Sequence, residues 1–394
     1  MRKKILIGLG ILLLLGGIIL AMQKITAETD YANKDFLVFW LAGHANWADI
    51  DPYSSADWIA ARYQFGAKSV PEPEFLYPLP LSVLLAPLGL LPLREAYFLW
   101  GVLSAILILV SLFLLYQVKR DEPKIAYLLI PFLFFAPLYP PLLLTLYLGQ
   151  LSAFLLLLAA LATYFWHKEN FFWGGFFIAF FTLKPSIGLT LLLFTALWLL
   201  YKKQLRAFGG MFTASLLLLG IGLLRDPHWV SRFLTISNNK MDNTFGYSPT
   251  IWGISGMACQ FQTNCTVTFG FVGFFLISAL TIWLFLRWKA HAPALEFSVI
   301  LALGLLSAPY LWPYDQLLLL IPLFLSLAAL LNDDVSPIKI LLIYLGVIFF
   351  SIGLGATANQ LGHQHENLYA YLSLFVWGFS LWALGREKEA PLRA

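Results

Sequence analysis

The sequence predicts an all-α integral membrane protein, and three observations carry that prediction. Of the 394 residues, 60% are hydrophobic and 12% are charged, whereas a soluble domain has about 25% charged residues. The apolar runs are roughly 17 to 25 residues long, the length that crosses a bilayer as a helix. The sequence lacks the strand-like alternation of a membrane barrel. We therefore expect a single membrane domain over residues 1–394.

About twelve spans are expected along the chain. Their ranges are 5–22, 94–117, 125–138, 150–166, 171–184, 187–201, 207–224, 267–286, 294–310, 315–331, 338–356 and 368–384. The first span follows Arg2, Lys3 and Lys4 and could instead be a signal peptide. Its apolar part is long for a signal peptide and no clean cleavage site follows it. We interpret it as a retained span with a cytoplasmic N-terminus.

The loops between these spans alternate in charge. Segments assigned to the inside hold 16 of the 25 lysines and arginines, and outside segments hold 13 of the 21 acidic residues. This agrees with the positive-inside rule. Two long polar segments, 23–93 and 225–266, then face outside, so we expect the chain to work at its outer face. The net charge of +4 reflects cytoplasmic anchoring and gives no reason to expect a nucleic-acid partner.

Prolines interrupt four of the helical stretches near their outer ends. They lie in the sequences "FLYPLPLSVLLAPLGLLP", "FAPLYPPLLLTLYLGQ", "TLKPSIG" and "SAPYLWPYDQ". Proline removes a backbone donor and breaks or bends a helix. Irregular backbone at membrane depth is tolerated where protein buries it or where it lines a watery cavity. The four breaks therefore predict one shared cavity that opens outward.

The first polar segment, residues 23–93, is too polar to span but rich in Trp and Tyr. Its stretch "SSADWIAARYQF" predicts a helix with Ser54 or Ser55 as N-cap. Such helices lie in the plane of the membrane interface. Two interpretations stay open: an aromatic belt of the kind most membrane proteins have, or a lid over the cavity.

Asp35 is an acid in the hydrophobic stretch "KDFLVFW", directly after the first span. It is either a satisfied carboxylate at the membrane surface or a general base in a semi-apolar pocket. Desolvation in such a pocket would raise its pKa toward a working range. Inverting sugar transfer from a lipid phosphate needs one such base, while the leaving phosphate needs cations or donors.

Lys184 is the strongest candidate for a cation that contacts phosphate. An ammonium at the outer end of two short spans is expensive and usually functional, although the side chain could also snorkel to the interface. The second polar segment offers weaker candidates for a phosphate contact, namely Arg225, Arg232 and Lys240. Of these we assign Arg232 to the phosphate site together with Lys184.

The sequence "LWPYDQ" places Trp312, Tyr314 and Asp315 together at an outer helix start. Asp315 could cap the helix or complement its dipole, or the three could form a sugar-binding surface. We assign them to the sugar and acceptor pocket together with Tyr77 and Gln150.

Cys259 and Cys265 stand close together in "CQFQTNC" and either pair in an oxidising compartment or remain free thiols. They are too few for a metal site. The sequence "HQHEN", residues 363–367, fits no strong metal motif and is interpreted as a polar outer loop. No nucleotide-binding fingerprint is present, so we do not expect a cytosolic nucleotide-sugar donor. We name no cofactor for this chain.

The order of these features resembles glycosyltransferase family 87, which includes bacterial polyprenol-phosphate-mannose-dependent α-1,2-mannosyltransferases. The resembling pieces are "KDFLVFW", "DIDPYSS", "FLYPLPLSVLLAPLGLLP", Trp100, Gly149–Gln150, Lys184–Pro185 and "SAPYLWPYD". The resemblance extends to about residue 320. It implies a GT-C type fold, an outer active site, a polyprenyl-phosphate-linked donor, no required metal, and Asp35 as the base. In the mannosyltransferases a histidine lies in the late Ser/Pro element, whereas this chain has Tyr314-Asp315-Gln316 there, so the resemblance fixes neither the donor sugar nor the acceptor.

The resemblance gives a specific functional hypothesis. It is an inverting glycosyltransferase of a bacterial plasma membrane, which moves mannose or another sugar from a polyprenyl phosphate to a lipid or glycan acceptor outside the cell. The alternative is a secondary transporter or lipid flippase, whose broken helices would carry the substrate near mid-membrane. The polar residues crowd the outer half and no two halves of the chain match, which favours the enzyme.

Overall fold

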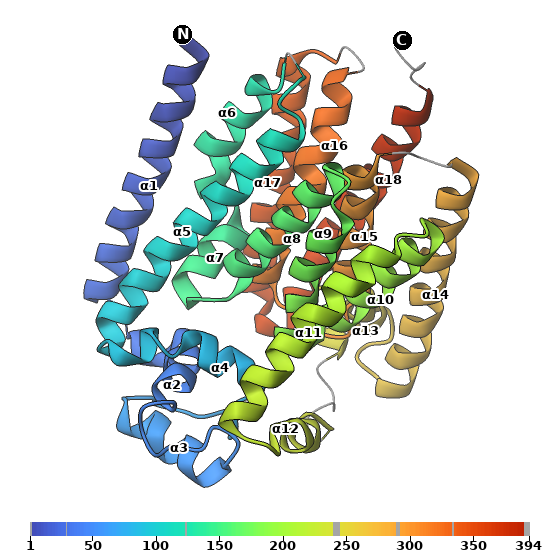
Figure 1. Cartoon of the computed structure of the whole chain (residues 1–394). Coiled ribbons are helices and arrows are strands. Elements are labelled where there is room, and N and C mark those ends of the chain that lie inside the picture. The colour runs from blue at the N-terminus through green and yellow to red at the C-terminus, as the bar shows by residue number, and fades with distance from the viewer. Residues whose placement is uncertain are drawn as a thin grey trace.

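The computed structural model describes residues 2–28, 30–122, 124–238, 245–288, 292–332 and 335–389. Within these ranges every regular element is a helix (Figure 1). This confirms the all-α prediction. The number of membrane crossings is a separate question, because helices of very different lengths make up the bundle.

Seven helical stretches in the described ranges are long and apolar enough to cross a membrane. They lie in α1 (Arg2–Glu28), α5 (Leu93–Val118), α11 (Leu205–Arg225), α14 (Thr263–Trp288), η6 with α16 (Pro313–Leu319, Leu320–Asn332), α17 (Pro337–Leu361), and η7 with α18 (His363–Tyr369, Ala370–Glu389). The chain therefore forms a polytopic membrane protein.

The remaining predicted spans are bent or short. One candidate is a pair bent by 54°, in which α6 and η3 (Ala126–Phe135, Ala136–Leu138) are followed by α7 (Pro140–Leu148). Four apolar helices are shorter: α8 (Ser152–His167), α9 with η4 (Phe171–Ala179, Phe180–Leu183), α10 (Pro185–Tyr201) and α15 (Pro293–Ser307). The expected total of twelve spans is thus not confirmed, because four segments fall below the length of a full crossing.

Several helices begin at a proline. Pro140, Pro185 and Pro313 each stand at the start of a helix, α7, α10 and η6. The first turn of a helix leaves its N–H groups unpaired, so proline costs nothing there and its fixed φ favours the start. The predicted breaks are therefore real, and each one is a point where one helix ends and another begins.

The two ends of the bundle differ. In Figure 1 both termini lie at the same end, and α2, α3, α4 and α12 lie at the opposite end. The short elements not yet given are η1 (Tyr31–Asn33), α2 (Phe36–His44), α3 (Ser55–Gln64), α4 (Leu79–Leu85), η2 (Leu88–Leu90), α12 (Trp229–Asn238), η5 (Phe245–Tyr247) and α13 (Ile251–Ala258). The first polar segment and the start of the second therefore share one end of the molecule, as expected.

Aromatic side chains of the first polar segment are divided between core and surface. Trp40 and Trp58 are 3% and 0% exposed, whereas Trp47 and Tyr63 are more than half exposed. Ser54 caps α3 by accepting a hydrogen bond from the Asp57 amide, as the sequence predicts. The buried rings fix α2 and α3 on the bundle, so this segment is more than a belt of surface aromatics.

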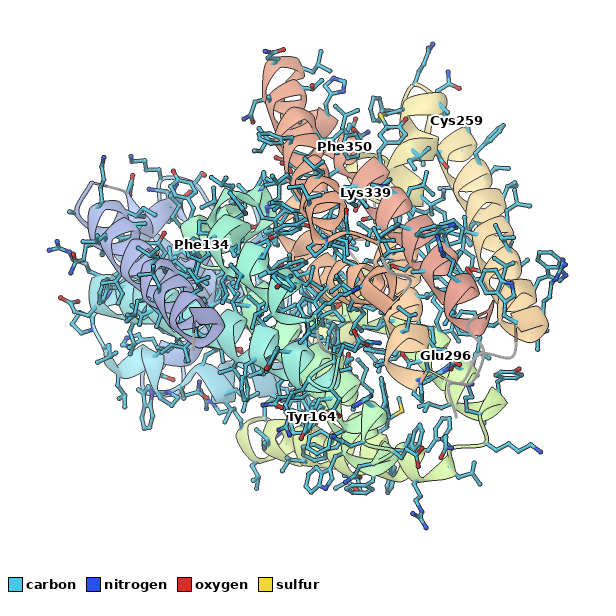
Figure 2. All side chains as sticks on the ribbon, turned by 90° about the horizontal axis from the view of Figure 1, so that it is seen from above. Phe134, Tyr164, Cys259, Glu296, Lys339 and Phe350 are labelled. Atoms are coloured by element: carbon cyan, nitrogen blue, oxygen red, sulfur yellow. A yellow bond between two sulfur atoms is a disulfide. The ribbon has the colours of Figure 1, made fainter. Side chains whose placement is uncertain are left out.

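Side chains fill the space between the helices (Figure 2). Glycines allow the closest helix contacts: a Cβ on Gly210 of α11 would lie 1.9 Å from the carbonyl oxygen of Phe172 in α9. Glu296 at the start of α15, labelled in Figure 2, is 1% exposed and accepts hydrogen bonds from Trp198 and Lys202, both at 2.7 Å. Buried acids in this bundle can thus be paired with a cation.

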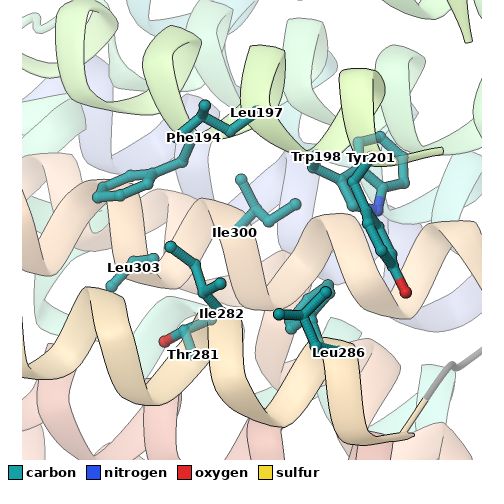
Figure 3. A pocket seen from close by; sticks show the side chains of 10 residues that line it. Phe194, Leu197, Trp198, Tyr201, Thr281, Ile282, Leu286, Ile300 and Leu303 are labelled. Carbon is teal, nitrogen blue, oxygen red and sulfur yellow. The ribbon is translucent and has the colours of Figure 1, made fainter. Parts of the chain in front are cut away.

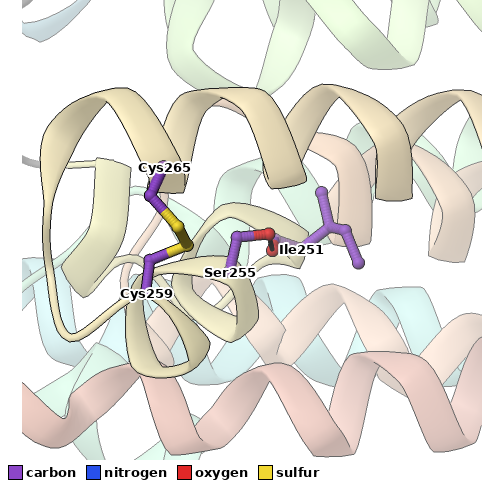
Figure 4. Close-up of a disulfide and its surroundings, with 4 residues drawn as sticks. All are labelled: Ile251, Ser255, Cys259 and Cys265. Atoms are coloured by element: carbon purple, nitrogen blue, oxygen red, sulfur yellow. Dashed lines mark hydrogen bonds between the residues drawn. A yellow bond between two sulfur atoms is a disulfide. The ribbon is translucent and has the colours of Figure 1, made fainter.

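Cys259 and Cys265 form a disulfide, shown in Figure 4. The bond joins the residue after α13 to the first turn of α14, and the Ser255 hydroxyl donates to the Ile251 carbonyl beside it. Of the two alternatives left open by the sequence, the structure has the disulfide.

Candidate active site

Asp35 lies between η1 and α2, directly before the first helical residue of α2. It occupies the N-cap position of α2 but its side chain caps no backbone amide. Instead its Oδ2 accepts a hydrogen bond from Nε2 of Gln150 at 2.5 Å. The carboxylate is therefore held by a neutral amide 115 residues away in sequence, and the simple helix-capping explanation for an acid here does not apply.

Gln150 reaches Asp35 because α7 ends in a tight turn. Gly149 has φ +68° and ψ +41°, a left-handed conformation that favours glycine. Its carbonyl accepts a hydrogen bond from Trp100 of α5 at 3.0 Å, and the Tyr97 hydroxyl donates to the Tyr147 carbonyl at 2.6 Å. Helix α5 thereby fixes the turn that presents Gln150.

Lys184 and Asp315 form a buried ion pair. Nζ of Lys184 lies 2.5 Å from Oδ1 of Asp315, and the two side chains are 6% and 0% exposed. Oδ1 also accepts from the Ser152 hydroxyl at 2.8 Å, and Oδ2 accepts from the Trp312 amide at 3.2 Å. The two carboxylate oxygens thus accept from three donors, and the Ser152 and Trp312 contacts hold Asp315 against Lys184 at the start of α10.

Tyr314 lies beside this pair, Trp312 contacts it through its backbone amide, and the charge of Asp315 acts on the Tyr77 hydroxyl. Nζ of Lys184 lies 4.9 Å from the ring centre of Tyr314, and Trp312 precedes η6 with a partly buried ring. Burial raises the pKa of the Tyr77 hydroxyl, and the carboxylates of Asp315 and Asp35 are close enough to raise it further. The charges of both acids therefore act on the Tyr77 hydroxyl.

The electrostatics of Asp35 differ from those of the two fully buried acids. Glu296 and Asp315 each pair with a lysine, whereas no described lysine or arginine forms an ion pair with Asp35. Burial raises the pKa of the Asp35 carboxyl; the Gln150 hydrogen bond opposes this, and the negative charge of Glu72 adds to it. A carboxyl with a raised pKa and only a neutral partner is suited to accept a proton.

Arg232 lies apart from this cluster. Its guanidinium pairs with Asp51 and, at 2.8 Å, with Asp226, and its Cζ lies 5.5 Å from the centre of the Tyr53 ring. Arg225 donates to the carbonyl of Ala45 at 2.7 Å. Both arginines thus join α11 and α12 to the first polar segment. Lys240, the third candidate for a phosphate contact in the second polar segment, lies outside the described residues.

Sequence reasoning missed four members of the cluster. Ser152 donates a hydrogen bond to Asp315. The charges of Glu72 and Arg62 act on Asp35, and the charge of Glu72 also acts on Arg62 and on the Tyr310 hydroxyl. Arg62 carried a signal that could have been used, since it stands four residues after Trp58 on the same face of α3. The other three are ordinary polar residues in loops or at helix starts, and their sequence context alone does not mark them.

The apolar cavity in Figure 3 is separate from the cluster. It measures about 250 Å³, lies between α10, α14 and α15, and is lined almost wholly by apolar side chains. None of the predicted site residues lines it. No group of three or more His, Cys, Asp or Glu residues among the described residues is arranged to hold a metal ion.

The structure thus brings seven predicted site residues, from five separate parts of a polytopic helical membrane protein, to one polar cluster. They are Asp35, Tyr77, Gln150, Lys184, Trp312, Tyr314 and Asp315. Hydrogen bonds join residues beside three of the predicted helix breaks to one another or to Asp35, while the shared outward-opening cavity stays a prediction. The site thus combines the carboxylate of Asp35, the amide of Gln150 and the ammonium of Lys184 with several aromatic residues.

The comparison with known families identifies the chain. Residues 75–322, more than half of the chain, match the model of glycosyltransferase family 87. The protein therefore belongs to glycosyltransferase family 87, and its activity is glycosyl transfer from a sugar donor to an acceptor. The match includes the cluster residues from Tyr77 to Asp315, while Asp35 lies before it. No curated protein and no solved structure matches the chain.

The turn at Gly149 offers a direct test of how Gln150 is positioned. In Gly149→Ala, the new Cβ would lie 2.5 Å from Cβ of Phe36 and the left-handed φ would be strained. We expect a loss of about 1–3 kcal/mol of stability and a fall in transfer activity. Thermal unfolding in detergent measures the first effect. The control is Gly346→Ala, where nothing lies within 4 Å; equal behaviour of the two variants would contradict this account.

Proposed function

We propose that this protein transfers a sugar from a polyprenyl-phosphate donor to an acceptor hydroxyl, with inversion at the anomeric carbon and Asp35 as general base. The observation that carries the proposal is the partly buried carboxylate of Asp35, which is held by the amide of Gln150 in the same cluster as the buried ammonium of Lys184. Membership of glycosyltransferase family 87 supports transfer over transport.

The reaction follows from these positions. Asp35 takes the proton of the acceptor hydroxyl as its oxygen attacks the anomeric carbon of the donor. The bond from that carbon to the phosphate oxygen breaks on the opposite face, and polyprenyl phosphate leaves with the bonding electrons. The proton on Asp35 then passes to water. Only side chains of this chain are used, and general-base catalysis of this kind contributes about 10²–10⁴-fold.

Lys184 is proposed to hold the phosphate. Its ammonium has three donors, so it can keep Asp315 and still donate to a phosphate oxygen. Asp315 and Tyr314 would then set its direction. Arg232 is proposed as a second contact, but it would first have to exchange Asp51 or Asp226 for the phosphate, because both carboxylates engage it.

The sugar and acceptor are proposed to lie against Tyr77, Gln150, Trp312, Tyr314 and Asp315. Gln150 supports this assignment, because its Oε1 is buried without a hydrogen-bond partner among the described residues while its Nε2 is committed to Asp35. A sugar hydroxyl would satisfy that oxygen. Aromatic rings such as Trp312 supply the apolar face on which a sugar ring packs. The donor sugar could be mannose, and the acceptor a lipid or a glycan.

We propose a GT-C type architecture in a bacterial plasma membrane, with the cluster on the extracytoplasmic side. The disulfide makes the orientation testable, since Cys259 and Cys265 are the only cysteines in the chain. In intact cells, a membrane-impermeant reductant followed by an impermeant maleimide should label both cysteines, and omission of the reductant should prevent labelling. Labelling that requires permeabilised cells would place this loop in the cytoplasm and overturn the topology.

The pH dependence of transfer reports on Asp35. Because its pKa is raised, kcat/KM should fall with decreasing pH at a higher pH than the ordinary Asp value of about 3.9. Glu72→Gln removes a negative charge that raises this pKa, so the acid limb should move to lower pH. Gln150→Leu removes a hydrogen bond that lowers it, so the limb should move to higher pH. If neither variant moves the limb, Asp35 is not the titrating base.

The function in cells can be tested without knowing the substrate. Mass spectrometry of glycolipids and envelope glycans, compared between cells with and without the gene, should show a glycan lacking one sugar in the deletion. Complementation with the wild-type gene should restore it, and complementation with an Asp35→Asn gene should not. Unchanged glycans together with a lost solute uptake would favour the transporter.

A further inference from the structure

Arg62 is a buried arginine whose charge is poorly paired. It lies on α3 with its side chain 8% exposed, and its NH1 is 3.8 Å from the Glu72 carboxylate and 3.3 Å from the Glu72 carbonyl. Its Nε is buried and has no hydrogen-bond partner in the described part of the chain. A guanidinium carries five donors and stays charged. Burying it with so few acceptors is costly unless a further anion meets it.

The position of Arg62 links it to the active-site cluster. Arg62 and Asp35 are close enough for each charge to act on the other, and Glu72 acts on both. Glu72 also acts on the hydroxyls of Tyr77 and Tyr310. The charges of Lys184 and Arg62 both act on Asp35, whereas Arg232 is held by Asp51 and Asp226. Packing also joins this face of α3 to the cluster: the Trp58 ring, one turn before Arg62, lies 5.6 Å from the Phe75 ring, which lies 5.4 Å from the Tyr77 ring.

The same face of α3 carries a second donor without an acceptor. Trp58 is 0% exposed, and its Nε1 has no hydrogen-bond partner among the described residues. Residues four apart on a helix are neighbours, so the Trp58 and Arg62 donors lie one turn apart on one buried face. Two donors without acceptors on one buried face of a helix are the pattern expected where a ligand with several acceptor oxygens binds.

The charges of the cluster identify the chemical class of that ligand. The charge of Lys184 is balanced by Asp315 at 2.5 Å, but the Arg62 to Glu72 contact is looser, at 3.8 Å. The Glu72 side chain is 46% exposed and can turn toward solvent. The planar guanidinium is suited to two parallel hydrogen bonds to a phosphate.

We propose that Arg62 binds the phosphate group of the lipid-linked donor, with Glu72 as the resident partner that the phosphate displaces. This proposal rests on the proposed function and adds a residue to its donor site. Arg62 then acts with Lys184 on the same phosphate. The two residues come from distant parts of the chain, Arg62 from α3 in the first polar segment and Lys184 from the start of α10. Donor binding would thereby add a contact, through the phosphate, between α3 and the start of α10.

Binding measurements on the purified full-length protein test this. The probes are a polyprenyl phosphate and the matching uncharged polyprenol, compared in the same detergent by competition against a fluorescent polyprenyl phosphate. The wild type should prefer the phosphate, and Arg62→Gln should reduce that preference by about tenfold or more, as loss of a charge-assisted bond requires. Arg62→Lys should restore part of it. Arg94→Gln, at an exposed arginine near the start of α5, is the matched control and should keep the preference.

The outcomes separate this proposal from the proposed function. An undiminished phosphate preference in folded Arg62→Gln overturns the role of Arg62 alone. If that variant does not fold, Glu72→Gln replaces it: freeing Arg62 should tighten phosphate binding, and unchanged or weaker binding overturns the proposal. Asp35→Asn should keep the phosphate preference without transfer. A wild-type protein with no phosphate preference overturns both the donor class and the role of Arg62.

Discussion

Asp35→Asn should reduce sugar transfer by about 10²–10⁴-fold while the protein remains folded. The amide has the size of the carboxyl but cannot take a proton from the acceptor hydroxyl. The pKa of Asp35 is raised in the folded protein, so the folded state binds a proton at this carboxyl more readily than the unfolded state does. The contribution of Asp35 to stability therefore falls as pH rises from about 3.9, the ordinary Asp value, through the raised pKa. At neutral pH the ionised carboxylate therefore costs stability, and we expect Asp35→Asn to be as stable as the wild type or more so.

The measurement is an initial rate of transfer alongside thermal unfolding of the same purified sample. Asp30→Asn is the matched control, because Asp30 is an exposed acid five residues earlier whose partner is the exposed Lys68. It should change neither quantity appreciably. Full activity in a folded Asp35→Asn protein would leave Asp35 as a structural carboxylate and would require another base.

Lys184→Met should have the largest effect on stability. It leaves the carboxylate of Asp315, whose side chain is 0% exposed, without its cation. Breaking a buried ion pair in this way lowers the free energy of unfolding by about 3–5 kcal/mol. The double variant Lys184→Met with Asp315→Asn should recover much of that loss, because neither charge is then left buried alone. An asparagine oxygen can still accept from Ser152 or the Trp312 amide. Thermal unfolding of the single and double variants measures the coupling.

The same pair of variants separates the two roles of Lys184. If Lys184 contacts the donor phosphate, the double variant should be stable and still inactive, with a raised KM for the donor in any residual activity. Recovery of transfer along with stability would show that Lys184 only neutralises Asp315. Arg287→Met is a suitable control, since Arg287 is an exposed cation near the end of α14.

The helix breaks could be predicted from the sequence because proline acts locally. Pro140, Pro185 and Pro313 each start a helix where the missing N–H is harmless, and the chain just before each of them is the irregular part. Residues beside the breaks at Gly149, Lys184 and Pro313 do contact one another or Asp35, but the outward-opening cavity expected between the breaks stays a prediction. The number of full crossings was not predictable, since the same breaks leave helices of intermediate length.

The partners within the site could not be predicted. Lys184 and Asp315 are 131 residues apart, and each had a plausible separate role as a snorkelling cation or a helix cap. Arg62 could not be recognised because its helix has the composition of an interfacial one, and its burial depends on the tertiary packing of α3, whose Trp58 ring contacts Phe75. Pairing of this kind is decided by tertiary packing, which a local pattern does not contain.

The most direct test of the central claim is sugar transfer by the purified protein in proteoliposomes. Polyprenyl-phosphate-linked sugars are supplied as donors, nucleotide sugars are the comparison, and the anomeric configuration of the new glycosidic bond is determined by NMR. The account predicts product from a polyprenyl-phosphate donor only, release of polyprenyl phosphate, and an anomeric configuration opposite to that of the donor. Retention of configuration, or product from nucleotide sugars alone, would contradict it.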